Sequence, residues 1–250
     1  MQPNEFAGRV VLITGSAAGI GAGLARAFAG QGARVVVNSR KAERLEPIVA
    51  EIRAQGGEVL PITANVRDYE QVRAMIEQAV EHFGRLDVLI NNAAGTFRTP
   101  AEQLTPNGWR AVIDTNLNGA FYCCHAAFPH LKASGGTIIN ISSVAGCVPS
   151  PSRAHYGASK AALNHLTETL AVEWGPHGIR VNAVAPGPIL TEASSWADPA
   201  KAAERQRLVP LGRIGRVEDV IGACLFLASE RAAYVNGAIL RVDGGPLGLW

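Results

Sequence analysis

The stretch VVLITGSAAGIG, residues 10–21, decides how this 250-residue chain folds. A short apolar run forms a strand candidate, a glycine-rich turn follows directly, and a helical pattern begins behind the turn. Glycines let the backbone turn sharply and approach a pyrophosphate, whose negative charge is stabilised by the N-terminus of the helix. This context predicts a phosphate-binding loop, with contacts from Gly15, Ser16, Gly19, Ile20 and Gly21.

Similar apolar runs recur along the chain and alternate with segments whose apolar residues have helical spacing. Most of these runs are continuously apolar, which is typical of parallel strands covered on both faces of a sheet. The pattern predicts an α/β fold in which helices flank a doubly wound, seven-stranded parallel sheet. The predicted strands are 9–14, 34–38, 59–63, 88–91, 137–141, 180–185 and 239–242.

No linker, repeat or low-complexity tract divides the chain, so residues 1–250 are predicted to form a single domain. One segment, 189–213, interrupts the alternation because it is polar, contains prolines and is long for a loop in a compact domain. Its place after the sixth strand suits a substrate lid made of one or two short helices. A plain surface insertion is the alternative.

Charge and composition argue against several classes of partner and cofactor. The chain has 23 Lys and Arg against 21 Asp and Glu, without a block of like charge, so neither nucleic acid nor a membrane surface is expected to bind. Every apolar run is well short of the roughly 20 residues that a bilayer requires. Because no secretory signal is recognisable either, we expect a cytoplasmic protein with reduced cysteines. The histidines lack the spacing of metal ligands, so no metal site is predicted.

The glycine spacing Gly-x-x-x-Gly-x-Gly in residues 15–21 resembles that of the short-chain dehydrogenase/reductase family, and further motifs of this family follow in order. They are Asn91-Asn92-Ala93-Ala94-Gly95, Asn116, Ser143, Tyr156-Gly-Ala-Ser-Lys160, Pro186-Gly187 and Val242-Asp243-Gly244-Gly245. The resemblance extends from Gly8 to Gly245 and implies a Rossmann-type domain that binds NAD(P). It also implies a homotetramer that uses the apolar helical stretches 154–174 and 217–227. The apolar tail 246–250 is a further candidate to dock on a neighbouring subunit, and a monomer with an ordinary tail is the alternative.

Tyr156 and Lys160 are the strongest catalytic candidates. They are four residues apart, so on a helix they share one face, and an ammonium near a phenol lowers the pKa of the phenol toward working pH. Such a phenol suits general acid or base catalysis. The resemblance assigns proton transfer to Tyr156 and a hydrogen bond with the nicotinamide ribose to Lys160.

Two further residues complete the set that the resemblance implies. Ser143 follows the fifth predicted strand, where a doubly wound sheet places its ligands, and is expected to orient the substrate oxygen. Asn116 is implied to help hold a water-linked proton relay to the lysine. A polar residue that bends a helix is the alternative for Asn116, and a turn residue is the interpretation for Ser142.

The resemblance also assigns the walls of the cofactor site. Asn92, Ala93 and Gly95 are expected along the adenosine and ribose, and Pro186, Gly187, Ile189 and Thr191 beside the nicotinamide carboxamide. Asn65 and Val66 are expected at the adenine. The family usually has Asp at the position of Asn65, to hold the adenine amino group. An Asn carbonyl accepts the same hydrogen bond.

Cofactor choice depends on the end of the second strand, at Ser39 and Arg40. An NAD enzyme generally has Asp or Glu about 20 residues beyond the glycines, to bind the ribose 2′-hydroxyl. Ser39 occupies that place, and Arg40 offers charge-assisted bonds to a 2′-phosphate. NADP(H) is therefore favoured. NAD is the alternative, because Ala18 stands where many NADP-preferring relatives have a basic residue.

These observations predict an NAD(P)(H)-dependent oxidoreductase that moves a hydride between nicotinamide and a carbonyl or secondary alcohol, 3-oxoacyl thioesters included. A rival within the family is an enoyl- or 2,4-dienoyl-CoA reductase, which residues 91–97 also resemble. A rival from another class is a sensor or scaffold that binds the cofactor without turnover. The intact set of Ser143, Tyr156 and Lys160 favours carbonyl chemistry.

Overall fold

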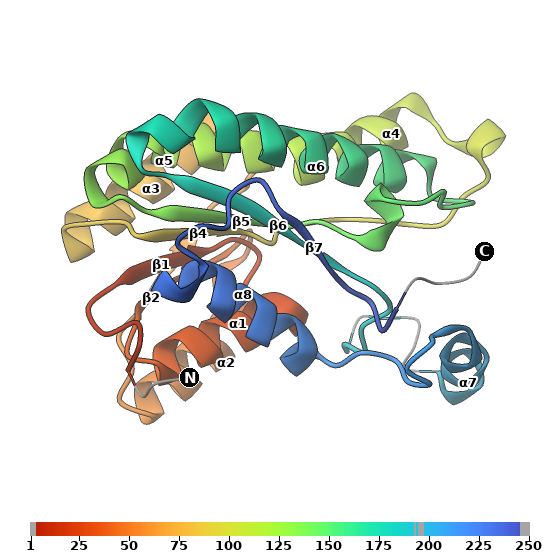
Figure 1. The fold of residues 1–250 in the computed structure, drawn as a ribbon, viewed down its shortest axis with the longest axis horizontal. Coiled ribbons are helices and arrows are strands. Elements are labelled where there is room, and N and C mark those ends of the chain that lie inside the picture. Colours follow the sequence, from red (N-terminus) through yellow and green to blue (C-terminus); the bar gives the residue numbers. More distant parts are fainter. Residues whose placement is uncertain (1–3, 193, 195–197, 246–250) are drawn as a thin grey trace.

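Seven parallel strands form one sheet in the computed structural model, which describes residues 4–192, 194 and 198–245 (Figure 1). Their order is β3-β2-β1-β4-β5-β6-β7, so the chain winds outward in both directions from the β1–β4 pair. The predicted doubly wound sheet is confirmed. The strands are β1 (Val10–Ile13), β2 (Arg34–Ser39), β3 (Val59–Thr63), β4 (Val88–Asn91), β5 (Thr137–Ile141), β6 (Arg180–Pro186) and β7 (Ile239–Val242).

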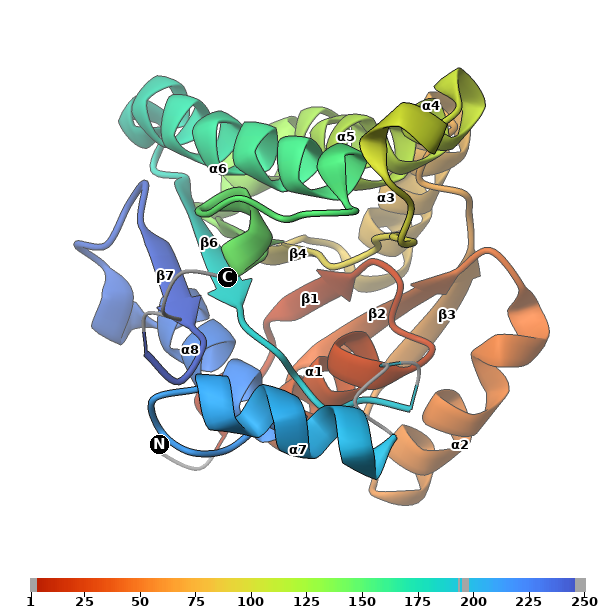
Figure 2. The same ribbon diagram turned by 90° about the vertical axis from the view of Figure 1, so that its right-hand side faces the viewer.

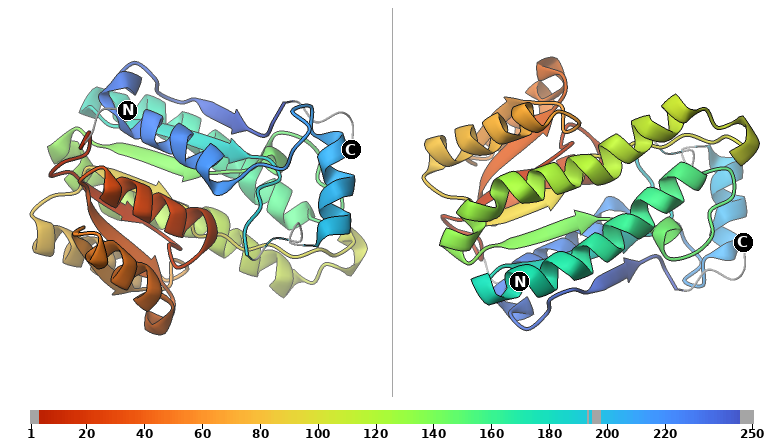
Figure 3. Two further views of the ribbon diagram at one scale, coloured as in Figure 1. Left: turned by 90° about the horizontal axis from the view of Figure 1, so that it is seen from below. Right: turned by 90° about the horizontal axis from the view of Figure 1, so that it is seen from above.

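Helices cover both faces of the sheet (Figures 1 and 3). One layer consists of α1, α2 and α8, and the other contains α3, α5 and α6. The helices are α1 (Gly19–Gly30), α2 (Glu46–Ala54), α3 (Tyr69–Phe83), α4 (Pro106–Ile113), α5 (Gly119–Ser134), α6 (Ala154–Trp174), α7 (Pro199–Leu208) and α8 (Val217–Ala228).

The continuous apolar runs of the sequence are explained by this double covering. Successive side chains of a strand point to opposite faces. In β1, Val11 and Ile13 pack into the core under α1, α2 and α8, whereas Val10 and Leu12 pack into the core under α3, α5 and α6. All four side chains are fully buried, so a polar residue on either face would be removed from water.

Helix starts also follow local sequence signals. Thr105 accepts a hydrogen bond from Gly108 N at 3.1 Å, with Pro106 at the first helical position of α4. Asp68 caps α3 in the same way through Gln71 N. No helix in the described part of the chain is long and apolar enough to cross a membrane.

The two ends of the segment 189–213 lie close together in the fold. A short bridge pairs Ile189 with Gly215, with Leu190 N 2.8 Å from Gly215 O. Between these ends lies α7, which Figure 1 shows at one end of the molecule, beyond α8, and Figure 2 shows in the foreground. Residues 193 and 195–197, and the tail 246–250, lie outside the described residues.

Candidate active site

The phosphate loop between β1 and α1 requires its glycines. Gly15 and Gly19 have φ values of +63° and +55°, a region that side chains with a Cβ rarely adopt. A Cβ on Gly15 would lie 2.8 Å from Ala93 Cα, and one on Gly21 would lie 2.5 Å from Asn92 Nδ2. The loop is thus pressed against the segment that follows β4, at the point where the strand order reverses.

Side chains from β1, β2 and the loop after β4 hold this turn. Asn92 Nδ2 donates to Thr14 O and Gly15 O, both at 3.0 Å, and Thr14 Oγ1 accepts from the backbone N–H groups of Asn92 and Ala93. Ser16 Oγ donates to Ile13 O at 2.9 Å. The side chains of Ser16 and Asn92, predicted to contact the cofactor, are therefore engaged in supporting the loop.

Asn38 is a supporting residue that sequence reasoning missed. It is buried near the end of β2, where its Oδ1 accepts from Gly15 N and its Nδ2 donates to Ile62 O and Ala64 O. The available signal was a single amide side chain after the three valines of a buried strand. A buried polar group needs such partners, because leaving it unpaired is costly.

The N-terminus of α1 is suited to an anion. Its N-cap residue, Ala18, makes no side-chain cap, and the first turn contains no acidic residue. The positive end of the helix dipole and its free N–H groups are therefore available to a pyrophosphate. Thr191 lies close to this loop: a Cβ on Gly19 would be 3.5 Å from Thr191 Cγ2.

A cavity of about 500 Å³ begins at the same loop and matches the adenosine side of a dinucleotide. It contains Arg44, which sequence reasoning missed, and Arg67, but no carboxylate among the residues described at its wall. The residues predicted from the sequence that line it are Gly15, Ser39, Arg40, Asn65, Val66, Asn92, Ala93 and Gly95. These residues fit the cofactor that the glycine loop predicts.

Two of the four predicted catalytic residues line a second cavity of about 280 Å³. Ser143 follows β5 and Tyr156 lies in the first turn of α6, and both side chains line this cavity with Gly187. Ser143 Oγ also accepts from Ala145 N at 3.2 Å, which fixes its place at the strand end. A substrate oxygen in this cavity therefore has two hydroxyl groups facing it.

Lys160 lies one turn after Tyr156, as predicted, but its ammonium points to the sheet. Nζ donates to Ile141 O at 2.7 Å and is 5.8 Å from the centre of the Tyr156 ring. Burial lowers the pKa of Lys160 to about 8.

The pKa of Tyr156 is governed by other groups than expected. Burial raises it, while a side-chain hydrogen bond with Ser143 and the positive charge of Arg153 oppose that rise. The expectation that the neighbouring ammonium lowers the phenol pKa is therefore wrong for this arrangement, because the Lys160 ammonium is directed at a backbone carbonyl.

Asn116 lies where the helix between α4 and α5 widens into a π-helical turn, Asp114–Asn118. Such turns commonly occur at functional sites. Its Oδ1 accepts from Gly95 N at 2.8 Å, and its Nδ2 donates to Gly95 O and to Ser159 Oγ, both at 3.0 Å. Asn116 thus links the loop after β4 to the helix of Tyr156, and its implied part in a proton relay stays a prediction.

The residues predicted for the nicotinamide wall follow the end of β6. Gly187 N donates to Val242 O at 2.9 Å, and a Cβ on Gly187 would lie 2.7 Å from Asp243 Cα. Pro186 ends the strand, and Ile189 packs into the hydrophobic core and so stabilises the wall from behind. The 186–191 segment therefore runs from the Ser143–Tyr156 cavity to the phosphate loop.

His155, beside Tyr156, is a packing residue. Its ring is fully buried and meets the ring of Phe97 edge to face, with centroids 4.3 Å apart. Burial lowers its pKa. The neutral imidazole therefore forms part of the wall behind the tyrosine.

Comparisons with known proteins agree with this geometry. A family model described as enoyl-(acyl carrier protein) reductase matches residues 15–246. The chain is 41% identical over 247 residues to 3beta-hydroxysteroid dehydrogenase 1 of Eggerthella lenta, covering 97% of this chain and 95% of that protein. It is 43% identical over 243 residues to a protein of Bacillus subtilis named probable 2,4-dienoyl-CoA reductase (95% and 96%), and 40% identical over 240 residues to 3-oxoacyl-(acyl-carrier-protein) reductase FabG of Thermotoga maritima (95% and 97%).

A solved short-chain type dehydrogenase/reductase from Mycobacterium marinum has a TM-score of 0.91 with this chain at 37% identity, covering 97% of this chain and 96% of that one. The glycine loop, the sheet order and these similarities define the class: the chain belongs to the short-chain dehydrogenase/reductase family. It is an NAD(P)-dependent oxidoreductase.

The lowered pKa of Lys160 predicts a pH limit for carbonyl reduction. Tyr156 stays protonated well above neutrality, whereas Lys160 loses its charge as the pH rises through about 8. We expect kcat/KM to be level below that pH and to fall above it, by at most about tenfold per pH unit. A profile measured between about pH 6 and pH 10 tests this.

Lys160→Met should abolish most of the activity at every pH, whereas Lys132→Met, on the exposed part of α5, should keep the full profile. A wild-type profile that stays level up to the highest pH would contradict the role of the lysine charge.

Proposed function

We propose that Tyr156, Ser143 and Lys160 carry out the interconversion of a carbonyl and a secondary alcohol in this enzyme. The observation that supports this most strongly is the shared cavity, into which Ser143 and Tyr156 project while buried Lys160 lies directly behind. NADP(H), when bound along the glycine loop, supplies or accepts the hydride.

In the reductive direction the substrate oxygen accepts hydrogen bonds from Ser143 and Tyr156. Tyr156 then donates its proton to the oxygen as negative charge develops there. The phenolate that remains is stabilised by the hydrogen bond with Ser143 and by the positive charge of Arg153. In the oxidative direction the same groups act in reverse.

Tyr156→Phe should retain the fold and cofactor binding and lower turnover by roughly 10²- to 10⁴-fold, the usual range for a general acid or base. The phenyl ring keeps the shape of the side chain and loses only the proton donor. Absorbance of NADPH at 340 nm, with a panel of ketones, alcohols and acyl-CoAs, measures the loss. Tyr122→Phe, on α5, is the matched control.

The same panel separates the rival functions. Turnover of an enoyl- or dienoyl-CoA, with no turnover of carbonyls, would favour reduction of a C=C bond, as the names of the family model and of the Bacillus subtilis relative suggest. Cofactor binding without any turnover would favour a sensor or scaffold. Wild-type rates in Tyr156→Phe with a carbonyl substrate would show that another group donates the proton.

We also infer that the preferred cofactor is NADP(H). The cavity beyond β2 contains three guanidinium groups and no described carboxylate at its wall, which suits the extra 2′-phosphate. Arg67 forms an ion pair with Asp114, with Nη2 3.8 Å from Oδ2. Arg40 and Arg44 form no ion pair within the described part of the chain. The two latter residues are the better phosphate ligands.

Arg40→Ala should weaken NADPH binding by about 10- to 150-fold, because a hydrogen bond to a charged group contributes roughly 1.5 to 3 kcal/mol. NADH binding should change little. Fluorescence titration with each cofactor measures both affinities, with Arg53→Ala at the exposed end of α2 as control. Equal losses for the two cofactors, or a wild-type preference for NADH, would contradict the assignment.

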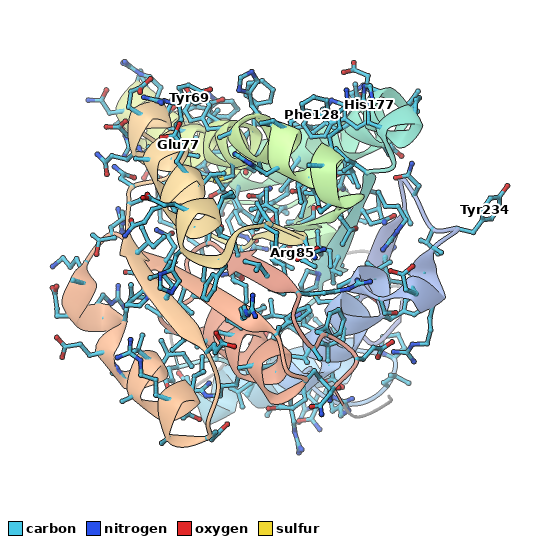
Figure 4. All side chains as sticks on the ribbon, turned by 90° about the vertical axis from the view of Figure 1, so that its left-hand side faces the viewer. Tyr69, Glu77, Arg85, Phe128, His177 and Tyr234 are labelled. Carbon is cyan, nitrogen blue, oxygen red and sulfur yellow. The ribbon has the colours of Figure 1, made fainter. Side chains whose placement is uncertain are left out.

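We propose that the protein is a homotetramer, as the family resemblance implies. Apolar side chains remain exposed on α5, α6, α8 and the edge strand β7: Phe121, Val172, Phe226 and Leu240. Tyr234 also projects fully into solvent from the turn before β7 (Figure 4). Association of the chains would remove these exposed apolar side chains from water.

Sedimentation velocity at micromolar concentration should give the mass of four chains. Val172→Glu should shift the distribution toward smaller species, because it buries a charge in the proposed interface. Glu173→Gln is the control on the same helix. A wild-type monomer would exclude the tetramer.

Three further proposals concern the chain as a whole. We propose that residues 1–250 form one domain and that 189–213 acts as a substrate lid, supported by the position of α7 and by the Ile189–Gly215 bridge at its base. A cytoplasmic location is supported by the four free cysteines, because reducing compartments keep thiols unpaired.

A further inference from the structure

The Ser143–Tyr156 cavity contains two arginines that have no acidic partner in the described part of the chain. Arg98 and Arg153 line it together with Ser, Pro, Val, Ala and Gly residues, and no described residue at the wall is a carboxylate. Neither guanidinium forms an ion pair with any part of the chain that the structure describes. The cavity beside the reacting hydroxyls is therefore electropositive.

The backbone holds these two charges in place although they repel each other. Arg98 lies after β4 and Arg153 lies directly before α6, and the two segments are joined by a hydrogen bond from Thr99 N to Ser152 O at 2.9 Å. Ser152 itself has a φ of +60°, which is strained for a residue with a Cβ. Burial and the charge of Arg98 both lower the pKa of Arg153. An anion bound between them would relieve this repulsion.

Two buried donors at the same wall also lack acceptors. Arg153 Nε and Ser150 Oγ are both inaccessible to solvent, and neither has a hydrogen-bond partner among the residues that the structure describes. Buried polar groups are normally satisfied, so an unsatisfied pair next to a catalytic cavity indicates a site shaped for a ligand that accepts hydrogen bonds. The guanidinium of Arg153 presents such a ligand with donors in a fixed fork, which matches the two oxygens of a carboxylate.

The position of Arg153 limits where the anion lies in the substrate. Its guanidinium carbon is 5.6 Å from the centre of the Tyr156 ring. A group bound by Arg153 is consequently close to the oxygen that Tyr156 protonates. The distant phosphates of a coenzyme A thioester do not meet this condition, whereas a carboxylate a few bonds from the carbonyl does.

We propose that the natural substrate is a short oxo acid, or the corresponding hydroxy acid, whose carboxylate is bound by Arg153 and Arg98. This inference rests on the proposed carbonyl chemistry and adds the substrate class. Arg153 and Arg98 then act as specificity residues that orient the carbonyl toward Ser143 and Tyr156. A phosphate monoester has similar acceptor chemistry and is separated by the test.

The test compares anionic and neutral substrates of matched shape. Wild-type enzyme should reduce acetoacetate with a KM at least about tenfold lower than that for methyl acetoacetate, because only the acid forms charge-assisted bonds. Dihydroxyacetone phosphate and dihydroxyacetone form the phosphate pair, and acetoacetyl-CoA represents the thioesters. Preference for the phosphate over both members of the first pair would replace carboxylate by phosphate and so overturn the proposal.

Variants of the two arginines separate substrate binding from the effect of Arg153 on the pKa of Tyr156. Arg153→Gln should raise the KM for acetoacetate by about 10- to 150-fold and leave that for the methyl ester within about threefold. Arg98→Gln, on an exposed residue that does not contact Tyr156, should give a smaller rise with the same selectivity. Arg153→Lys should recover part of the affinity, and Arg53→Gln should change nothing.

Binding gives a readout that does not depend on turnover. Calorimetric titration of the NADP⁺-saturated enzyme should detect acetoacetate but not its methyl ester, and the Arg153→Gln variant, with unchanged melting temperature and NADPH affinity, should lose that binding. Equal binding of acid and ester, or no binding of either, would overturn the proposal. Failure of the proposed function would appear differently, as binding of the acid without NADPH oxidation for any carbonyl compound.

Discussion

The close approach of the β1–α1 turn to the segment after β4 is the constraint on which the rest of the structure depends. There the backbone of Gly15 comes so near Ala93 that no side chain fits between them, and Asn92 joins the two segments through hydrogen bonds to Thr14 and Gly15. This contact lies at the reversal of strand order, so it opens the crevice that a dinucleotide occupies. It also fixes the start of α1, whose uncapped N-terminus is directed at the phosphate position.

Burial and charge work against each other around the catalytic tyrosine. Burial raises the pKa of Tyr156 and lowers that of Lys160, so each group is shifted toward its neutral form. Arg153, itself partly buried, contributes the positive charge that opposes the shift of the tyrosine. Within the described part of the chain no carboxylate pairs with Arg98 or Arg153, so an anionic substrate beside Arg153 would neutralise positive charge in the cavity.

Much of the fold was predictable because local patterns and packing agree. Runs such as 10–13 and 88–91 are apolar on both faces, and the structure buries both faces between helices. The catalytic spacing of Tyr156 and Lys160 was equally readable, since four residues on a helix define a common face. The direction in which a side chain points was harder to predict. Asn92 turns its side chain toward Thr14 O, and Lys160 turns toward Ile141 O, because these acceptors belong to residues distant in sequence.

The sequence by itself determined the alternation of strands and helices and the glycine loop, and it supplied the candidates for the catalytic set, since these depend on local spacing and residue chemistry. Only the tertiary structure decided which charges meet. Arg44 and Arg67 join Arg40 at the adenosine cavity from different segments of the chain, and Arg98 and Arg153, 55 positions apart in the printed sequence, line one cavity with Tyr156. The physical reason is that electrostatic interactions depend on distance in space. The packing of β4, β5 and α6 sets the distances between these charges only after the chain has folded.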